Sequence, residues 1–269
     1  MSPQNPESEW FGFRPVDAEE KTGLVHDVFS SVAGRYDLMN DLMSGGLHRL
    51  WKDALVRRMN PKPGMTLLDV AGGTGDIALR LHAAIQKQAQ SRLRGASDAS
   101  VPQSSRAQII VCDINPEMLE QGKIKAFDSG VVSGISFVEG NAEELPFEDR
   151  SVDMYSIVFG LRNVTRIDKA LEEAARVLKP GGRFFCMEFS PGVAPSLKPL
   201  YETYCMNVLP LIGEVVAQDR EAYQYLAESI MKFPSQDQLA KRMEKAGLDC
   251  VKWTNLTGGI AVIHESWRV

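Results

Sequence analysis

The sequence is short of cysteine, of long apolar runs and of positive charge. Its 269 residues include four cysteines, none of them in a Cys-x-x-Cys pair. This favours a reducing compartment and predicts neither a zinc site nor any other metal site. The net charge of −5, with a pI near 5.5, argues against a nucleic acid as the main partner.

The N-terminus lacks the features of a targeting sequence. Residues 1–10 are polar and acidic, without the Arg-rich pattern of a transit peptide or the apolar core of a secretory signal. The longest apolar stretch, residues 205–217, is interrupted by polar residues, a proline and a glycine, so it does not span a bilayer. We expect a bacterial-type cytoplasmic protein, soluble or at most resting on the inner face of a membrane.

The central part of the chain alternates between strand and helix patterns. Expected strands cover 66–71, 108–112, 135–138, 152–159 and 183–189, and expected helices cover 75–88, 116–127 and 167–178. Such alternation is typical of a parallel sheet with helices on both faces, so an α/β, doubly wound fold is predicted. A helix over 235–246 and a β-hairpin of 250–256 with 259–267 close the chain.

Several segments fall outside this alternation. Residues 1–20 are predicted to form a flexible N-terminal arm before a single domain over residues 21–269. Apolar residues at helical spacing predict a helical cap over 25–60 and a helical insertion over 195–231. We expect these two segments either to cover the strand ends or simply to pack as ordinary helices. Residues 86–107, rich in Ser, Ala and Gln, predict an exposed low-complexity insertion.

Residues 67–76, Leu-Leu-Asp-Val-Ala-Gly-Gly-Thr-Gly-Asp, are the most informative stretch. An apolar strand leads into a glycine-rich turn, and the start of a helix follows. Glycines let the backbone approach a ligand closely, and the helix N-terminus offers unpaired N–H groups. This pattern predicts a nucleoside-containing cofactor, although NAD sites and ordinary tight turns use similar sequences.

Two further features would meet this turn, because ligands of doubly wound sheets bind at the carboxyl ends of the strands. Asp113 ends an expected strand, where its carboxylate can accept hydrogen bonds from both hydroxyls of a ribose. Its alternative role is to cap the following helix. Asn141 and Ala142 follow the next strand and either read an adenine edge or belong to a plain polar loop.

Taken in order, these features resemble the class I S-adenosylmethionine-dependent methyltransferases. Residues 69–75, Asp-x-Ala-x-Gly-x-Gly, are similar to their first motif, with Ala71 where many members have glycine. Further segments resemble the ubiquinone/menaquinone biosynthesis C-methyltransferase family: residues 35–44, 48–52, 159–164, 225–230 and 255–259. The likeness covers residues 22–269 apart from the 86–107 insertion.

This resemblance implies an enzyme that methylates a ring carbon of a polyprenylated quinol. The expected acceptor is a 2-methoxy-6-polyprenyl-1,4-benzoquinol, a demethylmenaquinol or both. The fold implied is a mostly parallel, seven-stranded, Rossmann-like sheet with an antiparallel C-terminal hairpin. The S-adenosylmethionine site implied by the family motifs comprises Gly72, Thr74, Asp113, Asn141 and Ala142.

Arg162 and Asn163 are the catalytic candidates that the resemblance places beside the substrate. Because arginine stays protonated, we expect Arg162 to hold the quinol oxyanion, with water accepting the proton, while Asn163 orients the ring. Pairing of Arg162 with a carboxylate in a lid is the alternative. Lesser candidates, each expected to be structural, are Tyr36, Asp37, His48 and His264.

A polyprenyl quinol is confined to lipid, so peripheral contact with a membrane surface and an apolar tunnel for the tail are expected, and no nucleic acid partner. A homodimer and a quinone-biosynthesis complex both remain open as assemblies. Three other functions also stay open: a small-molecule O- or N-methyltransferase, an NAD-dependent oxidoreductase, and a non-catalytic lipid-binding subunit.

Overall fold

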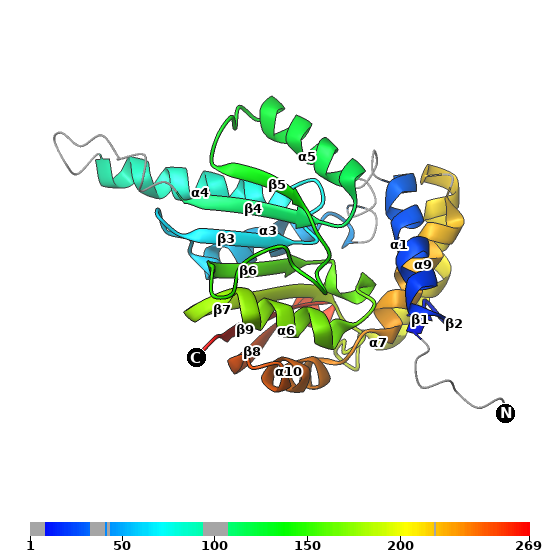
Figure 1. Cartoon of the computed structure of the whole chain (residues 1–269). Helices are drawn as coiled ribbons and strands as arrows, with labels where there is room; N and C mark the ends of the chain where they lie inside the picture. The colour runs from blue at the N-terminus through cyan, green and yellow to red at the C-terminus, as the bar shows by residue number, and fades with distance from the viewer. Residues whose placement is uncertain (1–8, 33–40, 42–43, 94–106, 218) are drawn as a thin grey trace.

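A seven-stranded sheet runs through the centre of the computed structural model, which describes residues 9–32, 41, 44–93, 107–217 and 219–269 (Figure 1). The strand order is β5-β4-β3-β6-β7-β9-β8. The strands are β3 (Thr66–Val70), β4 (Gln108–Asp113), β5 (Ile135–Glu139), β6 (Val152–Val158), β7 (Leu178–Phe189), β8 (Asp249–Leu256) and β9 (Ala261–Trp267). The first five in this order are parallel, whereas β9 is antiparallel to both β7 and β8. The predicted fold class is confirmed.

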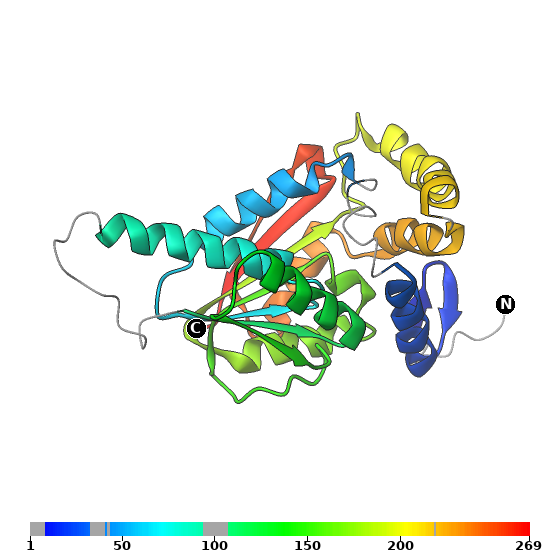
Figure 2. The ribbon, with the colours of Figure 1, turned by 90° about the horizontal axis from the view of Figure 1, so that it is seen from above.

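Alternate side chains of the strands are buried on opposite faces of the sheet, as the period of two requires. On one face, Leu67 and Phe185 belong to the core formed with α3 (His48–Met59) and α4 (Asp76–Leu93). On the other, Leu68 and Phe184 belong to the core formed with α6 (Ile167–Val177) and α10 (Gln236–Lys245). Figure 2 shows α4 and α6 on opposite sides of the sheet.

A group of helices lies beyond the carboxyl ends of the parallel strands (Figures 1 and 2). It consists of α1 (Ala18–Val32), α7 (Lys198–Thr203), α8 (Leu209–Ile212) and α9 (Arg220–Lys232), with π-helical turns η4 (Tyr204–Val208) and η5 (Gly213–Ala217). The expected insertion over 195–231 therefore contains helices at this end of the sheet. The expected cap over 25–60 does so only through α1, because α3 packs on a face of the sheet. Residues 33–40 and 42–43 of the expected cap lie outside the described residues.

Two expectations about irregular segments differ from the structure. Residues 9–20 are not a flexible arm, because β1 (Glu9–Phe11) and β2 (Arg14–Val16) form a hairpin and α1 begins at Ala18. Phe11 stacks on Tyr225 of α9, with ring centroids 4.1 Å apart, a contact between distant segments that composition does not reveal. The 86–107 insertion begins as helix, since α4 continues to Leu93. Residues 1–8 and 94–106 lie outside the described residues.

None of the helices in the described ranges has the length and apolar character needed to cross a membrane.

Candidate active site

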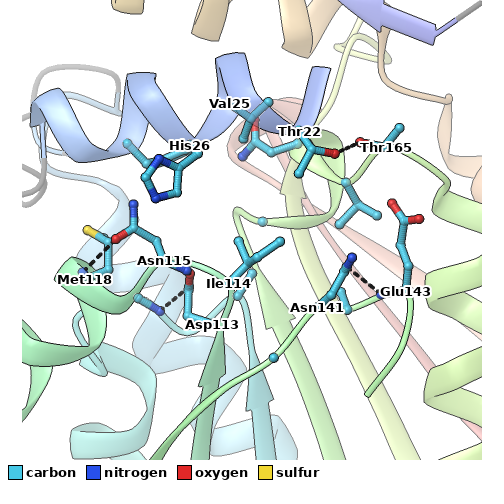
Figure 3. A pocket seen from close by; sticks show the side chains of 18 of the residues that line it. Thr22, Val25, His26, Asp113, Ile114, Asn115, Met118, Asn141, Glu143 and Thr165 are labelled. Carbon is cyan, nitrogen blue, oxygen red and sulfur yellow. Dashed lines mark hydrogen bonds between the residues drawn. The ribbon is translucent and has the colours of Figure 1, made fainter. Parts of the chain in front are cut away.

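A pocket with an empty volume of about 820 Å³ lies between the carboxyl ends of the parallel strands and α1. In Figure 3, Asp113, Asn115 and Met118 lie on one side of it and Asn141 and Glu143 on the other. Four of the predicted site residues line this pocket: Asp113, Asn141, Ala142 and Asn163. The other three, Gly72, Thr74 and Arg162, do not line it.

The glycine-rich turn after β3 forms part of the pocket wall through Ala71 and Gly73 rather than through the predicted Gly72 and Thr74. Ala71 and Gly73 both have positive φ angles, 49° and 51°. The Gly72 N–H donates to the carbonyl of Cys112 at 3.2 Å and so joins the turn to β4. The motif thus predicts the turn correctly, but not which of its residues face the pocket.

Asp113 is bound to the glycine-rich turn and to the start of α5 (Pro116–Asp128). Its Oδ2 accepts the N–H of Gly73 at 2.8 Å, and its Oδ1 accepts the N–H of Asn115 at 2.9 Å. The helix cap is Asn115, whose side chain accepts from the second and third residues of α5, so the capping alternative for Asp113 is wrong. Burial raises the pKa of Asp113, while backbone N–H groups lower it. With three backbone donors on it, from Gly73, Asn115 and Ile114, the carboxylate still has acceptor capacity for a ligand hydroxyl.

Asn141 and Ala142 lie opposite Asp113, in the loop after β5. The Asn141 side-chain oxygen accepts the N–H of Glu143 at 2.9 Å, which holds the loop. Its amide nitrogen has no hydrogen-bond partner among the described residues and is left for a ligand. Ile114 and Met118 add apolar surface to the pocket, which suits the flat face of a nucleobase.

Arg162 and Asn163 follow β6 in the short helix η3 (Leu161–Asn163). The Arg162 side chain is only 1% exposed and points away from solvent. Its Nη1 donates to Glu188 Oε2 at 2.8 Å and to the carbonyl of Phe159 at 2.7 Å. The carboxylate pairing considered as an alternative is therefore present, but its partner belongs to the core strand β7 and not to a lid.

Sequence reasoning assigned no role to Glu188, at the end of β7. Its two carboxylate oxygens also accept the backbone N–H groups of Arg162 and Phe189, at 3.2 and 3.1 Å. Burial raises the pKa of Glu188, and the neighbouring charge of Arg162 lowers it. A single carboxylate in the apolar segment 183–189 was the signal that could have identified it.

Tyr225 of α9 was also missed as a partner of the candidate Asn163. Its hydroxyl donates to Asn163 Oδ1 at 3.1 Å, in the core of the protein. The Asn163 amide nitrogen donates in turn to the carbonyl of Phe159 at 3.5 Å. Phe159 has a positive φ of 57°, an uncommon conformation that these contacts stabilise.

Below the glycine-rich turn, Asp69 is fully buried at the end of β3. Its Oδ1 accepts a hydrogen bond from Ser156 Oγ at 2.7 Å, while its Oδ2 has no partner among the described residues. Burial raises the pKa of Asp69 to about 7, although Ser156 and the charge of Lys52 lower it. Lys52 of α3 pairs with Asp76 at the start of α4, with Nζ 2.8 Å from Oδ2.

Helix α1 forms the outer wall of the pocket. Figure 3 shows Thr22, Val25 and His26 of this helix facing the strand ends. The hydroxyls of Thr22 and Thr165 are 3.2 Å apart, and Lys21 donates to the carbonyl of Val164 at 3.1 Å. These contacts attach α1 to the loop that directly follows Asn163.

The two histidines among the lesser candidates do not line the pocket. His48 is buried and lies 2.9 Å from Ser44 Oγ through Nδ1, and burial lowers its pKa. His264 on β9 contacts the carbonyl of Gln236 at 3.1 Å, and burial lowers its pKa to about 4. Tyr36 and Asp37 lie outside the described residues.

Sheet order, glycine-rich turn and strand-end carboxylate together define a class I methyltransferase. The chain superimposes on a SAM-dependent methyltransferase of Thermotoga maritima with a TM-score of 0.61, at 18% identity, covering 91% of this chain and 100% of that one. A profile of the ubiE/COQ5 methyltransferase family matches residues 16–268. The chain belongs to the ubiE/COQ5 methyltransferase family.

Two curated relatives are similar over nearly the whole chain. The mitochondrial 2-methoxy-6-polyprenyl-1,4-benzoquinol methylase of Danio rerio is 50% identical, over 97% of this chain and 85% of the relative. The ubiquinone/menaquinone biosynthesis C-methyltransferase UbiE of Brucella abortus (strain S19) is 50% identical, over 96% of this chain and 90% of the relative. These similarities confirm the resemblance that the motifs indicated.

Proposed function

We propose that the chain transfers a methyl group from S-adenosylmethionine to a ring carbon of a polyprenylated benzoquinol, a demethylmenaquinol or both. The observation that carries this proposal is the link between Asp113 and Gly73 in a pocket at the strand ends. The names of the two relatives support a quinol as the acceptor.

The residues of the pocket fit an adenosyl cofactor. Asp113 would accept hydrogen bonds from the ribose hydroxyls, and Ile114 and Met118 would flank the base. The free amide nitrogen of Asn141 and the backbone of Ala142 would contact the edge of the base. S-adenosylmethionine, when bound, supplies an electrophilic sulfonium methyl group.

Methyl transfer forms a bond between the ring carbon and the methyl carbon, breaks the bond between methyl carbon and sulfur, and releases a proton from the ring. The ring carbon is most nucleophilic when the neighbouring hydroxyl has lost its proton. A guanidinium has donors but no acceptor, so Arg162 stabilises the phenolate rather than acting as the base, and water accepts the proton. Glu188 positions Arg162, and Asn163, held by Tyr225, orients the ring.

The lipid character of this substrate supports a surface contact with a membrane. Leu200 and Val215, in the helical segment from α7 to η5, are 71% and 81% exposed. Exposed apolar side chains on one segment favour an interfacial position over insertion. We extend the proposal to peripheral membrane contact through this segment. We also propose that the protein assembles as a homodimer or in a quinone-biosynthesis complex, and the mass of the assembly in solution distinguishes the two.

The proposal is tested with methyl-labelled S-adenosylmethionine and reduced short-tail forms of both quinols. Mass spectrometry of the product is expected to locate the label on a ring carbon. A label on a quinol oxygen would instead support an O-methyltransferase, and cofactor binding without a label on either quinol would support a methyltransferase that acts on another small molecule, through oxygen or nitrogen. If the folded protein does not bind S-adenosylmethionine in calorimetry, this result would contradict the proposal that the chain is a methyltransferase of any kind.

Two variants test the role of Arg162. Arg162→Lys keeps a positive charge opposite Glu188 but loses the planar array of donors, so turnover is expected to fall by about 10²-fold with cofactor affinity unchanged. Arg242→Lys is the matched control, because Arg242 is half-exposed and lies 3.5 Å from Asp168 at the surface. Normal turnover by Arg162→Lys and Arg162→Ala would remove the proposed role.

A further inference from the structure

Three polar residues of α1 lie one turn apart on a single face of the helix: Thr22, His26 and Ser30. A spacing of four residues places side chains on the same side of an α-helix. The Thr22 hydroxyl lies 3.2 Å from the hydroxyl of Thr165, in the loop after η3. The Ser30 hydroxyl accepts a hydrogen bond at 3.0 Å from Nδ2 of Asn115, which caps α5. The two ends of this face are therefore attached to opposite sides of the pocket (Figure 3).

His26 lies between these two contacts and lines the pocket, on the side that contains Asp113 and Asn115 (Figure 3). Its side chain is 41% exposed, so the imidazole borders open space rather than packing in the core. Its Nδ1 is 3.7 Å from Oδ1 of Asp27, which is longer than a hydrogen bond, and the ring has no other polar partner in the part of the chain that the structure describes. An imidazole always has at least one N–H group, so His26 presents a donor to a ligand in the pocket.

The other α1 side chains that line the pocket offer a ligand no such donor. Val25 and Phe29 are apolar. The Thr22 hydroxyl donates to the carbonyl of Ala18 at 3.1 Å, so its hydrogen is already used within the helix. A hydrogen bond from α1 to a ligand in the pocket therefore comes from His26.

The wall opposite α1 presents an acceptor. The backbone N–H groups of Gly73 and Asn115 donate to the Asp113 carboxylate at 2.8 and 2.9 Å, so these donors are occupied. A ribose hydroxyl that donates to this carboxylate still has an oxygen that can accept a hydrogen bond. His26, on the facing wall, is placed to supply the donor for that oxygen.

We propose that His26 is a cofactor-binding residue, whose imidazole donates a hydrogen bond to the ribose of S-adenosylmethionine. This inference rests on the proposed function, because the ligand of the pocket is taken to be an adenosyl compound. Asp113 and His26 then bind the ribose from two sides, one as acceptor and the other as donor. The cofactor site is completed by α1, which the contacts of Thr22 and Ser30 hold in place.

His26→Leu removes the donor and introduces a residue that favours helix, so α1 is retained. We expect the dissociation constant for S-adenosylmethionine, measured by calorimetry, to rise by about 10-fold, the size of one lost hydrogen bond. The affinity for 5′-methylthioadenosine, which keeps the adenosine but lacks the amino-acid part, is expected to fall by the same factor. A loss confined to S-adenosylmethionine would place the contact on the amino-acid part and overturn the inference.

Deoxy forms of 5′-methylthioadenosine test whether the contact is with the ribose. Without the hydroxyl that His26 contacts, the wild-type protein and His26→Leu are expected to bind the ligand equally well. This equality is expected for at least one of the 2′-deoxy and 3′-deoxy ligands. A loss that persists in full with both ligands would overturn the inference, because His26 would then act on the base or on the fold.

His26→Gln keeps a side-chain N–H group and is expected to bind S-adenosylmethionine within about 3-fold of the wild-type affinity. His82→Leu is the matched control, since it makes the same change at a partly buried histidine of α4 that does not line the pocket. The thermal midpoint of the cofactor-free protein is expected to be the same in His26→Leu as in the wild type, because the side chain is half-exposed.

Two results would overturn the inference and leave the proposed function in place: wild-type affinity in His26→Leu, or an equal loss of affinity in His82→Leu. If the wild-type protein binds neither S-adenosylmethionine nor 5′-methylthioadenosine, the proposed function fails as well. Calorimetry of the wild-type protein therefore distinguishes the two failures.

Discussion

The ends of β3 and β6 leave room for only one Cβ atom between Ala71 and Gly160. A Cβ on Gly160 would lie 2.5 Å from the Cβ of Ala71, far closer than two carbon atoms can approach. Both residues line the pocket that contains Asp113, so this contact determines the shape of its wall. Ala71 also has a φ of 49°, a conformation that favours glycine.

Gly160→Ala is therefore expected to weaken S-adenosylmethionine binding by about 10- to 100-fold, because overpacking of this kind costs about 1–3 kcal/mol. Adding Ala71→Gly removes the obstructing atom and should restore most of the affinity, which calorimetry measures directly. Gly23→Ala is the control, since a Cβ there meets nothing within 4 Å. If the double variant binds S-adenosylmethionine as weakly as Gly160→Ala alone, the two residues do not share this space.

Asp113→Asn is expected to weaken cofactor binding by about 10- to 100-fold, the size of a lost charge-assisted hydrogen bond. In the wild-type protein the two carboxylate oxygens accept hydrogen bonds from the backbone N–H groups of Gly73 and Asn115. In the variant, the side-chain NH₂ group would face one of these N–H groups, so that two donors meet and one hydrogen bond is lost. Glu117→Gln makes the same chemical change at an exposed position of α5 and is expected to retain wild-type affinity. Equal affinities of both variants in calorimetry would remove Asp113 from the site.

The sequence predicted those parts of the site that depend on short segments. Asp113 and the glycine-rich turn were recognisable because each directly follows an apolar strand, and parallel strands bring their carboxyl ends together. Glu188 was not recognised, because its partner Arg162 lies on another strand connection. The hairpin of residues 9–16 was missed for the same reason, since Phe11 stacks on Tyr225, which lies far away in the sequence.

Asp69 is expected to make the stability of the cofactor-free protein depend on pH. Burial raises its pKa to about 7, whereas the pKa of an unfolded aspartate is about 3.9. The folded state therefore binds the proton more tightly, and the free energy of unfolding falls as pH rises from about 4 to about 7. Between pH 5 and 8 this contribution amounts to about 2–3 kcal/mol.

Asp69→Asn should remove that part of the pH dependence, because the amide still accepts from Ser156 but does not titrate. Urea unfolding at pH 5 and pH 8 measures the difference, with Asp128→Asn at the exposed end of α5 as the control. A variant that keeps the wild-type slope would assign the pH dependence to other groups.

Glu188→Gln is expected to destabilise the protein by about 3–5 kcal/mol, because it leaves the Arg162 guanidinium buried without a counter-charge. Neutralising both partners, in Glu188→Gln with Arg162→Gln, should cost less than the sum of the two single changes, since neither charge is then left alone. Urea unfolding of the four proteins gives this coupling free energy. Glu20→Gln is the control: its partner Arg14 is 2.9 Å away but more than half exposed, so a loss below about 1 kcal/mol is expected. Additive losses in the Arg162–Glu188 cycle would mean that the two side chains stabilise the strand ends independently, and Glu188 would then not be the residue that positions Arg162.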